Sequence, residues 1–232
     1  MRVLVLRPDD GASRTAARLK ALGHEAISSP VMETIATNAP GPAGDFDAVI
    51  ATSAQAFAFA NAAALAPFLR LPLMCVGART AQSARDAGFG VIASEAPDAA
   101  ALADTITGQT SARSFLYLAG RDRKPDLEQA LAAADIVITP WVIYEARALP
   151  ALRKEALESL RAGKLDAALH FSRRSAAIFC ELVAEAALEE EARALLHIAI
   201  SADAAKGLTQ IAPPRVRIAA APDEAHMLDE LI

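Results

Sequence analysis

One stretch of this sequence occurs twice and constrains the fold more than any other feature. Residues 47–55 read Asp-Ala-Val-Ile-Ala-Thr-Ser-Ala-Gln, and residues 166–174 read Asp-Ala-Ala-Leu-His-Phe-Ser-Arg-Arg. Each copy is an Asp, a short apolar run and then a hydroxyl ahead of an alanine-rich segment. A short run of small or branched apolar residues predicts a buried strand, and the Ser predicts a helix N-cap. The sequence therefore predicts two strand-to-helix turns.

The segments around these turns are repeated as well. Val3–Leu6 matches Phe115–Leu118, and Pro97-Asp98 matches Pro222-Asp223 at the start of a closing helix. Strands that alternate with helices of about ten residues predict right-handed βαβ units and parallel sheets. The tandem duplication therefore predicts an α/β fold with two similar open parallel-sheet, flavodoxin-like domains.

The sequence also predicts three local features. A helix should run from Ala54 to about Ala64, after the first turn. Pro and Gly give residues 34–44 the composition of a linker. A strand is expected at Ile136–Thr139, followed by a second strand-like run at Trp141–Tyr144.

Composition excludes several classes of protein. The chain has 232 residues, enough for two domains of roughly 100 residues each. Its net charge of -5 disfavours nucleic-acid binding, and no apolar run reaches the roughly 18 residues that span a membrane. A strand at the very start leaves no room for a signal peptide. Cys75 and Cys180 are expected to be buried thiols. We therefore expect a cytoplasmic protein without membrane contact.

The common catalytic motifs are missing from the sequence. It contains no G-x-G-x-x-G, no G-x-x-x-x-G-K-[ST] and no H-E-x-x-H motif, and neither Ser turn has the G-x-S-x-G form. His24, His170, His197 and His226 are scattered, so each is expected to be a single structural or surface histidine. Metal, nucleotide and acyl-transfer chemistry are disfavoured, and we expect no metal and no cofactor.

What remains is a set of hydroxyls, glycines and arginines at strand ends. In open α/β sheets ligands bind outside the carboxyl ends of the strands, and helix N-termini there favour anions. Taken singly, each Ser or Thr reads more simply as a cap and each Arg as a solvated charge. Several such turns converging on one cleft between two domains favour a binding site for carboxylates or phosphates. The candidate binding residues are Arg7, Thr52, Ser53, Gly77, Thr80, Gly120, Arg121, Ser172, Arg173 and Ser201.

Tyr144 is one of only two tyrosines and closes the run Trp141–Tyr144. Two interpretations stay open for it. It is either an aromatic packed at a domain junction or a group that transfers a proton in a partly dry cleft.

The order and spacing of several segments resemble those of a known family. The matching segments are Leu6-Arg-Pro8, Thr52-Ser53, Val76-Gly-Ala-Arg-Thr-Ala81, Leu116-Tyr-Leu-Ala-Gly120, Val142-Ile-Tyr144, Phe171-Ser172 and the Pro222-Asp223 helix. Across nearly the whole chain they resemble the uroporphyrinogen-III synthases of tetrapyrrole biosynthesis. That resemblance implies two α/β domains on two extended linkers, with the ligand cleft between the domains. One domain would comprise residues 1–34 and 149–232 and the other residues 37–146, with linkers at about 33–38 and 144–150.

The resemblance also implies a reaction. It is the cofactor-free cyclisation of hydroxymethylbilane, a linear tetrapyrrole, to uroporphyrinogen III with inversion of ring D. Loss of the terminal hydroxyl gives an azafulvene cation, ring D attacks through its substituted carbon, and a spiro intermediate fragments and recloses. Catalysis is then mainly orientation of a substrate with eight carboxylates, and Tyr144 would assist departure of the hydroxyl. We expect a monomer.

One segment departs from the family pattern Ile-Gly-x-x-Thr-Ala. Here it reads Ile200-Ser-Ala-Asp-Ala-Ala205, so Ser201 replaces Gly, Ala204 replaces Thr, and Asp203 would repel an anionic ligand. The alternative is therefore a non-catalytic or diverged protein of the same fold that binds a tetrapyrrole or another polyanion. A hinged two-lobe sugar or nucleotide binder is weaker, because no export signal or nucleotide loop is present.

Overall fold

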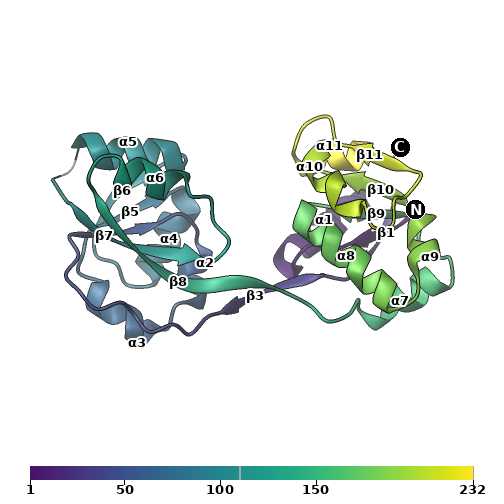
Figure 1. The fold of residues 1–232 in the computed structure, drawn as a ribbon, viewed down its shortest axis with the longest axis horizontal. Coiled ribbons are helices and arrows are strands. Elements are labelled where there is room, and N and C mark those ends of the chain that lie inside the picture. The colour runs from purple at the N-terminus through teal and green to yellow at the C-terminus, as the bar shows by residue number, and fades with distance from the viewer. Residues whose placement is uncertain (110, 232) are drawn as a thin grey trace. The chain divides into compact units, whose positions relative to one another are not determined.

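The computed structural model describes residues 1–109 and 111–231 and contains two compact units. Unit 1 comprises Met1–Glu33 and Arg147–Ile232, and unit 2 comprises Thr34–Ala146. Each unit is a largely parallel sheet with helices on its faces (Figure 1), so the predicted α/β class is confirmed. No helix of the described ranges is long and apolar enough to cross a membrane.

Unit 1 has a five-stranded sheet in the order β11-β10-β9-β1-β2, and its neighbouring strands pair parallel. The strands are β1 (Arg2–Val5), β2 (Glu25–Ser28), β9 (Ala167–His170), β10 (Leu196–Ala199) and β11 (Val216–Ile218). The helices are α1 (Asp9–Ala21), α7 (Lys154–Arg161), α8 (Arg173–Glu185), α9 (Glu189–Arg193), α10 (Ala202–Ala205), η2 (Lys206–Leu208) and α11 (Glu224–Asp229).

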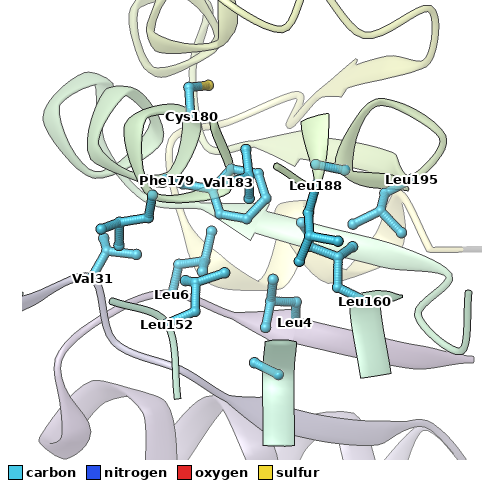
Figure 2. Close-up of a cluster of buried hydrophobic side chains, with 14 of the residues drawn as sticks. Leu4, Leu6, Val31, Leu152, Leu160, Phe179, Cys180, Val183, Leu188 and Leu195 are labelled. Atoms are coloured by element: carbon cyan, nitrogen blue, oxygen red, sulfur yellow. The ribbon is translucent and has the colours of Figure 1, made fainter. Parts of the chain in front are cut away.

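Both faces of the central strands β1, β9 and β10 are buried, which explains why these strands are almost continuous apolar runs. Val3 and Val5 pack into a cluster with Leu19 of α1 on one face. Leu4 packs on the opposite face, into the cluster that contains Phe179 of α8 (Figure 2). Successive residues of a strand point to opposite faces, so a single run supplies both cores.

Unit 2 has a six-stranded sheet in the order β3-β8-β7-β4-β5-β6. The strands are β3 (Met32–Ala36), β4 (Ala48–Ala51), β5 (Leu73–Val76), β6 (Ile92–Ala96), β7 (Ser114–Gly120) and β8 (Val137–Ala148). The helices are α2 (Gln55–Phe59), α3 (Ala62–Leu65), η1 (Ala66–Phe68), α4 (Ala78–Asp86), α5 (Ala99–Gln109) and α6 (Asp126–Ala132).

The two segments that run from one unit to the other are neighbouring strands, β3 and β8. The Leu149 N–H donates to the Val31 carbonyl at 2.9 Å, and the Thr37 N–H donates to the Ile143 carbonyl at 2.8 Å. Because these partners occur in opposite order along the chain, the pairing is antiparallel. Part of the segment expected as linker is therefore strand, and the two short runs expected around Pro140 form one 12-residue strand. Each segment satisfies backbone groups of the other.

The single helix expected from Ala54 to about Ala64 is wrong, because the structure has two short helices there. Ala60 is extended, with φ -68° and ψ 136°, and ends α2. The Asn61 side chain accepts hydrogen bonds from the N–H groups of Ala63 and Ala64, at 2.9 and 3.2 Å, and starts α3. An Asn that caps a new turn interrupts a run that its alanine content alone would continue.

The Asp at the start of each copy of the duplicated stretch accepts backbone hydrogen bonds from the neighbouring strand in both units. The Asp47 carboxylate accepts hydrogen bonds from the N–H groups of Arg113 and Ser114, at 2.8 and 2.9 Å, and these bonds lower its pKa. The Asp166 carboxylate accepts a 2.6 Å bond from the N–H of Arg2. Each Asp thus ties the start of its strand to the start of the neighbouring parallel strand, β7 or β1.

Candidate functional site

The carboxyl ends of β7, β4 and β5 of unit 2, together with Tyr144 of the neighbouring β8, bring predicted site residues together. The strand order β8-β7-β4-β5 places Tyr144, Gly120, Thr52 and Gly77 along one edge of the sheet. Gly120 pairs directly with Tyr144, and Ala51, which precedes Thr52, pairs with Leu118. In parallel sheets this edge is where ligands bind.

The Tyr144 ring lies directly on Gly120. A Cβ atom at Gly120 would lie 2.7 Å from ring atoms of Tyr144 and 2.9 Å from its hydroxyl oxygen, so only glycine fits there. The ring of Phe59 lies on another side of Tyr144, with centroids 6.1 Å apart. Within residues 1–109 and 111–231, no group makes a hydrogen bond with the Tyr144 hydroxyl. This half-buried phenol is therefore held by packing.

Behind the Thr52 turn lies Tyr117, which is not among the residues predicted from the sequence. Its hydroxyl is 2.8 Å from the Thr52 hydroxyl oxygen, and Tyr117 is only 4% exposed. Burial raises the pKa of Tyr117. Tyr117 stands inside a buried strand, so its position in the sequence alone does not mark it as a site residue. The available signal was that the chain has only two tyrosines.

The Gly77 turn starts α4. Gly77 has φ 78° and ψ 148°, a left-handed conformation that favours glycine. No side chain in the described part of the chain caps α4, so N–H groups of its first turn stay open to an anion. Thr80 is buried behind this turn, with 5% exposure. Ser53 accepts a 3.3 Å hydrogen bond from the Gln55 N–H and shapes the turn at α2.

Two basic side chains on this edge of unit 2, Arg121 and Arg123, have carboxylate partners. Arg121 is exposed and pairs with Glu145. Arg123 pairs with Glu128 and donates a 3.2 Å hydrogen bond to the Gly120 carbonyl. Both cations are therefore partly neutralised within the unit.

A cavity of about 320 Å³ lies in unit 2 and shares the Phe59 ring with the surroundings of Tyr144. Its lining has no charged side chain: Thr37, Asn38, Ala39, Pro40, Phe59, Asn61, Ala63, Ala64, Trp141 and Ile143. Such a lining suits a neutral group better than a carboxylate.

In unit 1, three adjacent strands end at Arg7, Ser172 and Ser201. The Ser172 hydroxyl accepts a 3.1 Å hydrogen bond from the Ser175 N–H and caps α8. The Ser201 hydroxyl accepts a 3.2 Å bond from the Ala204 N–H and caps α10. The capping interpretation of both serines is therefore confirmed. Capping leaves the Ser201 hydroxyl proton free to reach another acceptor, whereas the Ser172 hydroxyl also bonds to the Ser175 hydroxyl at 2.9 Å.

Arg7 is held tightly within unit 1. Its guanidinium lies 4.3 Å from the centroid of the Phe171 ring and 3.5 Å from the Glu224 carboxylate. A Cβ atom at Gly11 would overlap the Arg7 side chain, which explains the glycine in α1. Burial lowers the pKa of Arg7, and Glu224 partly opposes that shift. Arg7 thus stabilises this edge of the sheet, and the Glu224 carboxylate already offsets part of its charge.

The sequence matches the family described as Uroporphyrinogen-III synthase HemD over residues 13–229. The chain belongs to the uroporphyrinogen-III synthase family. No curated protein matches the sequence.

Two solved structures of synthases are similar. The uroporphyrinogen-III synthetase from Helicobacter pylori 26695 has a TM-score of 0.62 and 18% identity, with 100% of this chain and 98% of that chain covered. A mutant uroporphyrinogen III synthase from the extremely thermophilic bacterium Thermus thermophilus has a TM-score of 0.49 and 18% identity, with 100% and 97% covered. The first similarity establishes a shared fold with the synthase from H. pylori.

The segment that departs from the synthase pattern is locally balanced in charge. Asp203 lies 3.5 Å from the Arg173 guanidinium and 3.9 Å from the Lys206 ammonium. Two cations therefore offset the carboxylate that was expected to repel an anionic substrate. Ser201 keeps a helix cap in place of the family's glycine.

Two histidines of this synthase form a buried pair, although single histidines were expected. His170 Nε2 is 2.9 Å from His197 Nδ1, and His197 Nε2 is 2.9 Å from the Ala192 carbonyl. The rings stack with centroids 5.1 Å apart. Within the described ranges, no group of three or more His, Cys, Asp or Glu is placed to hold a metal ion. The pair belongs to the core of unit 1.

Proposed function

We propose that this synthase closes hydroxymethylbilane to uroporphyrinogen III without a cofactor, with Tyr144 as the proton donor. Family membership makes the chain a cyclising lyase of tetrapyrrole biosynthesis. The observation that supports the role of Tyr144 is its hydroxyl, which packs on Gly120 at the ligand-binding edge without a hydrogen-bond partner in the described ranges. A phenol in that state is a suitable general acid.

The proposed reaction begins at the hydroxymethyl carbon of the substrate. Tyr144 donates its proton to the departing hydroxyl, the C–O bond breaks, and water leaves. The pyrrole nitrogen lone pair stabilises the resulting azafulvene cation. The substituted carbon of ring D attacks the methylene carbon and forms a spiro centre, which fragments and recloses with ring D inverted. The proton lost on reclosure balances the proton that Tyr144 gave.

Orientation of the substrate carries most of this catalysis. The substrate has eight carboxylates, and the open N–H groups of α4 with the hydroxyls of Thr52 and Ser53 offer donors in unit 2. In unit 1, Ser172, Arg173 and Ser201 are the proposed contacts. We further propose a monomer that works in the cytoplasm without nucleic acid, in keeping with its net charge of -5.

The isomer of the product tests this function. Purified protein is supplied with hydroxymethylbilane, and the products are oxidised and separated by chromatography. We expect more of the type III isomer than of the type I isomer, which forms without enzyme. Type I product alone would support the non-catalytic alternative, which no structural observation favours.

A further inference from the structure

The hydroxyl pair of Thr52 and Tyr117 joins the site edge to the core of unit 2. Thr52 follows β4 and is half-buried, whereas Tyr117 lies within β7 and is 4% exposed. Their oxygens are 2.8 Å apart. Over residues 1–109 and 111–231, neither hydroxyl makes a second hydrogen bond. One proton of the pair therefore lies between the two oxygens, and the other is free.

The relative acidity of the two hydroxyls determines which one donates the hydrogen bond. A phenol, with an ordinary pKa of about 10, is a stronger acid and hence a better donor than an aliphatic alcohol. Tyr117 therefore donates to the Thr52 oxygen, and the free proton is the one on Thr52. The opposite arrangement would present only lone pairs of Thr52 to the edge, and lone pairs repel a carboxylate.

We propose that Tyr117 is a positioning residue that holds the Thr52 hydroxyl as a hydrogen-bond donor toward a substrate carboxylate. The inference rests on the proposed function, which supplies the carboxylate. Accepting from Tyr117 polarises the Thr52 hydroxyl, so its own bond to an anion becomes stronger.

The surroundings of Tyr117 keep it in the donor state. Burial raises its pKa, so the phenol stays protonated at neutral pH. The guanidinium carbon of Arg123 lies 5.9 Å from the centroid of the Tyr117 ring. Arg123 is itself fixed by Glu128 and by the Gly120 carbonyl, so it does not compete for the phenol oxygen.

Steady-state kinetics of three variants test the proposal. Thr52→Val removes the donor, and we expect about a tenfold rise in KM for hydroxymethylbilane because a bond to a charged group is lost. Tyr117→Phe keeps the ring, and we expect KM to rise about threefold with kcat little changed, the pattern of lost uniform binding. In the double variant Tyr117→Phe should add nothing, because its effect acts only through the Thr52 hydroxyl.

Two controls separate positioning from structure. Thr52→Ser keeps a hydroxyl and should restore most of the affinity in the presence of Tyr117. Thr105→Val removes a hydroxyl that donates to the Ala101 carbonyl in α5 and should leave KM unchanged. Thermal melting of each variant shows whether the fold is kept.

The inference is overturned if wild-type enzyme makes the type III isomer while Tyr117→Phe has an unchanged KM. It is also overturned if Tyr117→Phe raises KM equally with and without the Thr52 hydroxyl. Failure of the wild-type enzyme to make the type III isomer would instead remove the proposed function itself.

Discussion

The buried histidine pair predicts that unit 1 loses stability in mild acid while unit 2 does not. His170 and His197 are fully buried, and burial lowers the pKa of both, that of His170 well below its ordinary value. His197 donates from Nε2 to the Ala192 carbonyl, so its Nδ1 accepts from His170. The His170 Nδ1 atom then has no hydrogen-bond partner. Both rings are neutral in the folded state.

The sign and size of the effect follow from linkage. Below pH 6.5 the unfolded chain protonates its histidines and the folded pair does not, so acid favours unfolding. The stabilisation is complete above pH 6.5 and declines as the pH falls toward the lowered folded pKa. Below pH 6.5, each histidine that stays neutral in the folded state lowers the free energy of unfolding by about 1.4 kcal/mol per pH unit. Between pH 6.5 and 5.0 this amounts to about 2 kcal/mol. His170 has the more strongly lowered pKa and should therefore remove up to about 2 kcal/mol from the stability of unit 1 at pH 5.0.

The duplication supplies the control within the molecule. Ala51 of β4 and Leu73 of β5 hold the positions in unit 2 that His170 and His197 hold in unit 1, and they do not titrate. Hydrogen exchange of peptides from β9 and β10 reports unit 1, and fluorescence of the only tryptophan, Trp141, reports unit 2.

Urea unfolding at pH 7.5 and pH 5.0, followed with both probes, should show the acid loss in unit 1 only. The loss should shrink in His170→Gln, which does not titrate. The carboxylates of Asp47 and Asp223 have lowered pKa values, so they affect stability mainly below pH 4 and do not disturb the comparison between pH 7.5 and 5.0. An equal acid response of the two units, or an unchanged loss in His170→Gln, would refute the reasoning.

Two glycine substitutions test the packing of the site. Gly120→Ala should push the Tyr144 ring aside, cost about 1–3 kcal/mol and slow turnover more than tenfold, since misplacing a reacting group by about 1 Å can cost 10²-fold. Gly108→Ala, with open space around it, is the matched control and should leave turnover unchanged. Gly207→Ala would overlap the Arg173 carbonyl and should lower the melting temperature of unit 1 through a similar cost. Normal turnover in Gly120→Ala would show that Tyr144 is not held by this contact.

The sequence alone predicted the fold class because strand and helix patterns are local and were repeated. The capping roles of Ser172 and Ser201 were equally local and are confirmed. The pairing of β3 with β8 joins segments about 110 residues apart in sequence, so linker composition around Pro40 could not indicate it.

Two features of the site depended on tertiary contacts. Tyr117 lies in β7 and Thr52 directly follows the neighbouring β4, and only the register of β4 with β7 brings their hydroxyls together. The histidine pair likewise joins β9 to β10, and each histidine taken alone resembled an ordinary core residue. The sequence pattern explained Gly120 only as the end of a strand. The physical reason for the glycine is the Tyr144 ring, which leaves no room for a Cβ atom there.

The central claim is that orientation sets the isomer and that Tyr144 speeds departure of the hydroxyl. The most direct test is the single-turnover rate and isomer composition of wild-type enzyme and Tyr144→Phe with hydroxymethylbilane. We predict type III product from both, formed about 10²-fold more slowly by the variant, because general-acid assistance is lost while orientation is kept. An unchanged rate in Tyr144→Phe, or type I product from the wild-type enzyme, would contradict the claim.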